Sequence, residues 1–132
     1  IEARKVFPGS RITGVIEAEA EEHQEQVDFV KWFRVSYPDV LIFAIPNGGY
    51  RSRVTASRLK AEGVVKGIPD LYIPAWNLWV EMKRTKGGSV SPDQKSMMEY
   101  LEKYCRHQTI VAKGSDHAKE QIDHFVQRLE KW

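Results

Sequence analysis

The spacing of apolar residues along the chain predicts four helices. Apolar side chains recur every three to four positions in Glu21–Ser36, in the segment from Ser91 to Arg106 and in a last segment that begins at Ser115. This period is typical of helices that pack one face on a core. A fourth helix, Ser52–Glu62, is expected to end at Gly63, because glycine commonly follows the last turn of a helix.

Shorter apolar runs predict strands. Val40–Ile45 is a continuous apolar run, which favours a buried strand that ends at the turn residues 46–49. Asp70–Ile73 and Leu78–Lys83 are expected to form a hairpin, and Gln108–Ala112 a further strand. The order α-β-α-β-β-α-β-α predicts an α/β fold in which helices flank a mixed β-sheet. Residues 1–17 have no clear period, so we expect an irregular N-terminal arm.

Length and composition indicate one globular domain over residues 1–132. No apolar run approaches the about 20 residues that span a bilayer, so we expect no membrane association. Cys105 is the single cysteine, which excludes a cysteine-built zinc site and, with no secretory signal at the start, favours the cytoplasm.

Charge is unevenly distributed, although the net charge is only +2. Between positions 51 and 66 a single acid, Glu62, accompanies five cations that are candidates for contacts with DNA phosphates: Arg51, Arg53, Arg58, Lys60 and Lys66. For any one of Arg58, Lys60 and Lys66, the alternative is a helix face that only meets solvent.

The predicted hairpin carries the most informative chemistry. If facing positions sum to 151, Asp70 lies opposite Glu81, with Cβ atoms about 4.5–5.5 Å apart. Two carboxylates at that distance repel each other unless a divalent cation such as Mg²⁺ lies between them. Lys83 shares the face of Glu81, so the set predicts metal-dependent hydrolysis of a phosphodiester. The alternative is a turn aspartate beside a solvated strand face.

Three short motifs resemble a known nuclease family. They are Gly67-Ile68-Pro69-Asp70-Leu71, Glu81-Met82-Lys83 and Ser91-Pro92-Asp93-Gln94. Together, over roughly residues 20–115, they resemble the virus-type replication–repair nuclease (VRR-NUC) domain of the PD-(D/E)XK superfamily, in its stand-alone phage or prophage form. The resemblance implies a restriction-endonuclease-like core, Mg²⁺ or Mn²⁺ as cofactor, and endonuclease action on DNA.

The resemblance also implies roles for individual residues. Glu22 of the first helix would join Asp70, Glu81 and the Met82 backbone carbonyl as a metal ligand, with Glu25 as the alternative to Glu22. Lys83 would orient the attacking water or stabilise the phosphate. Gln94 would bind a water or a phosphate, or would be only an early polar residue of its helix.

Stand-alone members of this family resemble Holliday-junction resolvases that act in DNA repair, so we expect a homodimer that makes symmetric cuts in a four-way junction. Trp76, expected to be exposed at the hairpin tip, and the N-terminal arm are candidates for the dimer surface. A phage or prophage protein would work in the bacterial cytoplasm. The alternatives are a monomeric flap or nicking endonuclease, an inactive DNA-binding module, and a hydrolase or transferase of small phosphate esters, which would leave the basic segment unexplained.

Overall fold

The computed structural model describes residues 11–46 and 52–131. The elements, in chain order, are α2 (Arg11–Ser36), β1 (Phe43–Ala44), α3 (Arg53–Ala61), β2 (Leu71–Ile73), the 3₁₀ turn η1 (Pro74–Trp76), β3 (Leu78–Lys83), α4 (Pro92–Lys103), β4 (Gln108–Lys113) and α5 (Ser115–Glu130). The predicted α/β class and element order are confirmed. No helix in these ranges is both long enough and apolar enough to cross a membrane.

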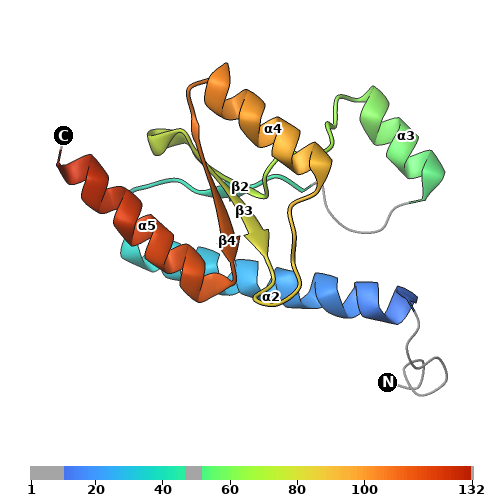
Figure 1. Ribbon diagram of the computed structural model, residues 1–132, viewed down its shortest axis with the longest axis horizontal. Coiled ribbons are helices and arrows are strands. Elements are labelled where there is room, and N and C mark those ends of the chain that lie inside the picture. Colours follow the sequence, from blue (N-terminus) through green and yellow to red (C-terminus); the bar gives the residue numbers. More distant parts are fainter. Residues whose placement is uncertain (1–10, 47–51, 132) are drawn as a thin grey trace.

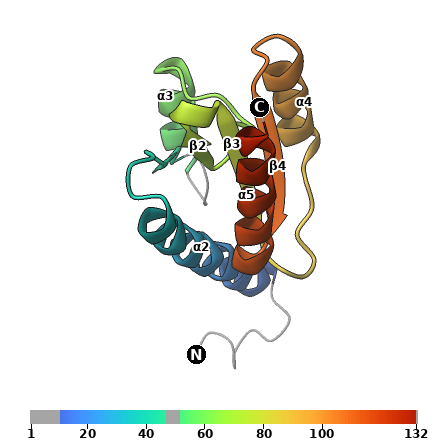
Figure 2. The ribbon, with the colours of Figure 1, turned by 90° about the vertical axis from the view of Figure 1, so that its left-hand side faces the viewer.

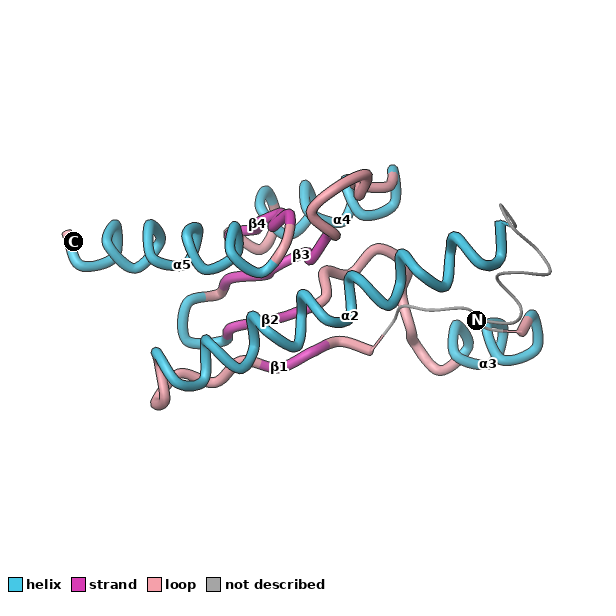
Figure 3. The backbone as a smooth tube through the Cα atoms, turned by 90° about the horizontal axis from the view of Figure 1, so that it is seen from below, coloured by secondary structure: helices cyan, strands magenta, loops and turns pink. Residues whose placement is uncertain are grey.

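The four strands form one mixed sheet in the order β1-β2-β3-β4 (Figure 3). β1, β2 and β3 are antiparallel, whereas β3 and β4 are parallel. In the hairpin Leu71 faces Val80 and Ile73 faces Leu78, so facing positions sum to 151 as predicted. β3 lies between two partners, and its side chains alternate between the two faces of the sheet.

α2 and α5 cover one face of the sheet and form the core with it. Phe29 and Phe33 of α2 are fully buried with Phe125 of α5 against Val80 and other β3 side chains that point to this face. α4 lies on the opposite side of the sheet from α2 (Figure 1) and buries Met98 and Leu101. The odd-numbered side chains of β3 therefore point toward the α4 side.

The first helix is longer than the sequence predicts. α2 begins at Arg11, so the expected irregular arm is wrong for residues 11–17, and residues 1–10 lie outside the described part. Extending an existing helix costs little, because each added residue also adds a hydrogen bond. Residues 15–20 are good helix formers or apolar, which offsets the penalty of about 1 kcal/mol at Gly14.

Two further expectations are wrong. The buried strand expected over Val40–Ile45 is reduced to Phe43–Ala44, which pairs on one side only at the sheet edge, and Ile42 alone of this run is buried. Trp76 does not project from the hairpin tip. The turn η1 folds back onto the core, and the Trp76 ring lies 5.5–5.7 Å from Phe33, Tyr37 and Phe125.

Candidate active site

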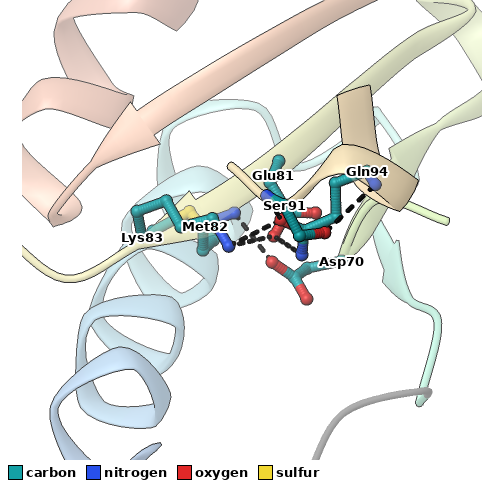
Figure 4. Close-up of polar contacts among 6 residues, drawn as sticks. All are labelled: Asp70, Glu81, Met82, Lys83, Ser91 and Gln94. Carbon is teal, nitrogen blue, oxygen red and sulfur yellow. Dashed lines mark hydrogen bonds and ion pairs between the residues drawn. The ribbon is translucent and has the colours of Figure 1, made fainter. Parts of the chain in front are cut away.

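The hairpin places two carboxylates side by side on the face that looks toward α4. Asp70 directly precedes β2, and the register sets it opposite Glu81 of β3. Glu81 is only 2% exposed, and Asp70 is half-buried. Oδ2 of Asp70 accepts the backbone N–H of Met82 at 2.8 Å, which fixes the aspartate beside the strand (Figure 4).

Burial and mutual repulsion change the acidity of this pair. Burial is the main cause that raises the pKa of Asp70. The pKa of Glu81 rises from 4.5 to about 8, first because of burial and then because of the neighbouring Asp70 charge. The ammonium of Lys83 lowers the pKa of both carboxyls but does not cancel the effect of burial. The pair therefore favours a state in which a proton or a cation neutralises part of its charge.

Lys83 and Gln94 complete the polar set. The Lys83 ammonium lies 3.3 Å from Glu81 Oε2 and donates to Gln94 Oε1 at 2.9 Å. Gln94 Nε2 donates to the same Glu81 oxygen at 3.0 Å. The structure therefore brings Asp70, Glu81, Met82, Lys83 and Gln94 together, as Figure 4 shows.

Gln94 is also part of the cap of α4. Ser91 Oγ accepts the Gln94 N–H, and Gln94 Oε1 accepts the Ser91 N–H, so the two residues form a capping box. The same amide oxygen accepts from the Lys83 ammonium. The Gln94 side chain thus connects the start of α4 to Glu81 and Lys83 of β3.

A glycine holds the segment before Asp70 against the same helix end. Gly67 has φ +88°, and a Cβ on it would lie 2.5 Å from the Asp93 carbonyl oxygen. Any other residue here would force the segment away from α4. Gly67 therefore allows Asp70 and Gln94 to approach the same point.

Pro69 has a specific consequence for the Met82 carbonyl. The Lys83 carbonyl accepts the Gly114 N–H on the β4 side, so the backbone groups of Met82 point to the β2 side, where its N–H meets Asp70. The register sets Pro69 opposite Met82. Because proline has no N–H, it cannot donate to the Met82 carbonyl.

These oxygens fit a divalent metal ion. Glu81 Oε1 is buried and has no hydrogen-bond partner, which is costly unless another group satisfies it. Carboxylate and carbonyl oxygens are the ligands that Mg²⁺ and Mn²⁺ prefer. Within residues 11–46 and 52–131, however, no group of three or more His, Cys, Asp or Glu side chains is placed to hold an ion. The structure pairs Asp70 with Glu81 but does not bring Glu22 into a group with them.

Glu25, the alternative to Glu22 as a metal ligand, makes its hydrogen bonds to the start of α5 instead. Its Oε2 accepts the Ser115 N–H at 2.8 Å and the Thr85 hydroxyl at 3.1 Å. A carboxylate there caps α5, whose N-cap position is occupied by Gly114 with no side-chain cap of its own. Glu25 is therefore a structural link between α2 and α5. Glu22 is half-buried one turn earlier, on the side of α2 that carries Phe29.

The basic segment lies apart from the carboxylates. α3 has no buried residue and stands away from the helices that cover the sheet (Figures 1 and 2). Arg53 and Lys60 on it are exposed, Arg58 pairs with Glu62 at 3.6 Å, and Lys66 lies 4.0 Å from Asp93. Arg51 lies outside the described residues.

Comparison with solved structures finds a similarity that covers most of the chain. No family model and no curated protein matches the sequence. A solved structure described as "VRR_NUC domain protein" is similar, with 26% sequence identity and a TM-score of 0.65. The similarity covers 81% of this chain and 88% of that chain, so the two share their fold over most of their length.

Proposed function

This chain is a VRR-NUC domain by its fold, and from that premise we propose that it is a metal-dependent endonuclease that hydrolyses phosphodiester bonds in DNA. The observation that carries the proposal is the set of half-buried Asp70 with buried Glu81 and Lys83 on one face of the hairpin. Burying two like charges with a lysine destabilises a fold that has no use for them. The inactive binding module is therefore the weaker interpretation.

The residues of the site divide into ligands and donors. Asp70, Glu81 and the Met82 carbonyl would hold Mg²⁺ or Mn²⁺. Glu22 of α2, which is not grouped with them among the described residues, would become a further ligand when the ion binds. A bound ion supplies a Lewis acid for the phosphoryl oxygens and acidifies a water molecule. The Lys83 ammonium donates to the attacking water or to the charged phosphate in the transition state. Gln94 positions Lys83 and Glu81 through its two amide atoms.

The exposed basic segment supports DNA as the substrate. Five cations would contact phosphates on either side of the cleaved bond, and such contacts position a nucleic acid without reading its sequence. They are Arg51, Arg53, Arg58, Lys60 and Lys66. Lys66 lies closest to the site along the chain, because the Gly67 turn that follows it leads directly to Asp70.

We propose branched DNA as the substrate, with a four-way junction cut by a homodimer as the first candidate. Two symmetric cuts need two copies of the site, and a two-fold dimer supplies them. A DNA-repair role in the cytoplasm of a bacterial host follows if a phage or prophage encodes the protein. The second candidate is a monomeric flap or nicking endonuclease, which needs a single copy of the site for each cut.

Cleavage of labelled DNA tests the proposal. Wild type, Asp70→Asn and the exposed control Asp39→Asn are compared on a four-way junction, a flap and a linear duplex in Mg²⁺, Mn²⁺ and EDTA. We expect metal-dependent cutting by wild type and Asp39→Asn, and a loss of at least 100-fold in Asp70→Asn, of the order seen when an essential group is removed. Paired symmetric cuts in the junction support the resolvase, and cuts confined to flaps support the second candidate. Binding to DNA without cleavage in either metal would refute the nuclease.

A further inference from the structure

The sheet face that carries the candidate site continues into aromatic side chains. Tyr72 lies two positions after Asp70 in β2, and Trp79 lies two positions before Glu81 in β3. Residues two apart on a strand share a face, so the Tyr72 and Trp79 rings lie directly beside the carboxylates. Their ring centroids are 4.1 Å apart with an interplanar angle of 30°.

These rings are held in place by hydrogen bonds. The Tyr72 hydroxyl donates to Asn77 Oδ1 at 2.8 Å, and Trp79 Nε1 donates to His107 Nδ1 at 3.0 Å. The His107 ring is nearly parallel to both of its aromatic neighbours, and Phe43 of β1 packs edge-on against Tyr72 at 5.8 Å. The rings are therefore fixed before any partner binds, which lowers the entropy cost of binding.

Tyr100 of α4 and Tyr104, the C-cap residue of this helix, add two exposed tyrosines on the side that faces β2. The first turn of α4 contacts the segment leading into β2, because Asp93 lies against Lys66 and Gly67. Tyr100 and Tyr104 follow Asp93 by two and three helical turns, so they lie on the same side of the helix. They stack on each other at 5.3 Å and are 54% and 78% exposed.

We propose that this aromatic surface binds the unpaired bases of a DNA strand whose backbone passes through the candidate site. The surface consists of Phe43, Tyr72, Trp79, His107, Tyr100 and Tyr104. The proposal rests on the proposed nuclease function and names its substrate class, DNA with a single-stranded segment next to the cleaved bond. Bases stack on aromatic rings whatever their sequence, and Tyr72 and Trp79 of the surface lie next to the groups that would hold the phosphate.

A binding experiment without cleavage tests the proposal. Fluorescence anisotropy in EDTA measures the affinity of the full chain for a labelled oligothymidylate, for an abasic oligomer with the same number of phosphates, and for a linear duplex. We expect the double substitution Tyr100→Ala and Tyr104→Ala to weaken oligothymidylate binding by about tenfold or more, since each stacked base contributes substantially. We expect little change for the abasic oligomer and the duplex.

Two controls separate stacking from other effects. Tyr100→Phe with Tyr104→Phe keeps the rings and should retain wild-type affinity. Leu129→Ala removes an exposed apolar side chain of α5 and should have no effect.

An equal loss of affinity for the abasic oligomer or the duplex would overturn the proposal, as would unchanged affinity for oligothymidylate. A change of the alanine variant from dimer to monomer in size-exclusion chromatography, with unchanged oligothymidylate affinity, would also overturn it and assign the surface to a second copy of the chain. Because no metal is present, the result is independent of the cleavage test. If the protein stacks bases but cuts no DNA, the proposed nuclease function is refuted and the proposed base-stacking surface is not.

Discussion

Replacing Glu81 by glutamine should destroy activity and yet stabilise the metal-free protein. Glu81 is 2% exposed, its Oε1 has no partner, and Asp70 repels its charge. Glutamine has nearly the same shape and no charge. It should therefore keep the packing and remove the repulsion, as expected where a functional site carries a cost in stability.

The magnitude follows from the pKa of Glu81. The free carboxyl has a pKa of 4.5 and the folded one about 8, so between these values the folded protein binds the proton more tightly than the unfolded chain. The contribution of Glu81 to the free energy of unfolding is therefore highest below about pH 4.5 and falls as the pH rises to 8. The ceiling of the loss is about 5 kcal/mol, at about 1.4 kcal/mol per pKa unit. We expect a gain of about 1–3 kcal/mol for Glu81→Gln at pH 9, because the substitution also deprives the buried Lys83 of a partner.

Thermal unfolding followed by circular dichroism in EDTA checks this reasoning. At pH 9 we expect the Tm of Glu81→Gln to exceed that of wild type by about 5–10 °C. The two curves should converge toward pH 5, where Glu81 is protonated. The exposed control Glu120→Gln should follow wild type at every pH. Mg²⁺ should raise the Tm of wild type and not that of Glu81→Gln. A lower Tm of Glu81→Gln than of wild type at pH 9, or a wild-type Tm that does not fall from pH 5 to 9, would refute the argument.

Two further predictions concern α2 and the basic segment. Glu25→Ala should lower the Tm, because it removes the cap of α5 at a cost of about 1–2 kcal/mol, whereas Glu22→Ala should chiefly weaken Mg²⁺-dependent cleavage. Thermal unfolding and Mg²⁺ titrations of activity compare the two, and the reverse outcome would exchange their roles. Arg51→Ala with Arg53→Ala should weaken DNA binding and make the slope of log affinity against log salt shallower by about 2, roughly one for each phosphate that an arginine no longer neutralises. Binding isotherms at several salt concentrations measure that slope, and an unchanged slope would remove these arginines from the DNA surface.

The parts of the fold that depend on local sequence could be predicted, and the central hairpin shows why. A short connection and the alternation of Leu78, Val80 and Met82 leave one register that buries all three side chains. That register alone sets Asp70 opposite Glu81. The cap of α4 is equally local, since Ser91 and Gln94 are three residues apart.

The parts that depend on distant contacts could not be predicted. Glu25 caps a helix that starts 90 residues later in the chain, and only the packing of α2 against α5 creates that contact. The covering of Trp76 by Phe125 depends on the same pair of helices. In the sequence, Gly114 was the signal that α5 needs a cap from a distant residue. A helix that follows a glycine has no side-chain cap of its own, so its first N–H groups need an acceptor from elsewhere in the fold.

The two faces of β3 explain how the fold remains stable although it carries the destabilising carboxylate pair. The carboxylates lie on the α4 side of β3, and the apolar side chains that stabilise the strand lie on the other side, against α2 and α5. The alternation of a strand thus separates the residues that destabilise the fold from those that offset them. Met82 shows this most directly, because its side chain is buried in the core while its N–H bonds Asp70. A core substitution at Met82 should therefore displace the carboxylate pair as well as lower stability, so at this position the two effects cannot be separated by mutation.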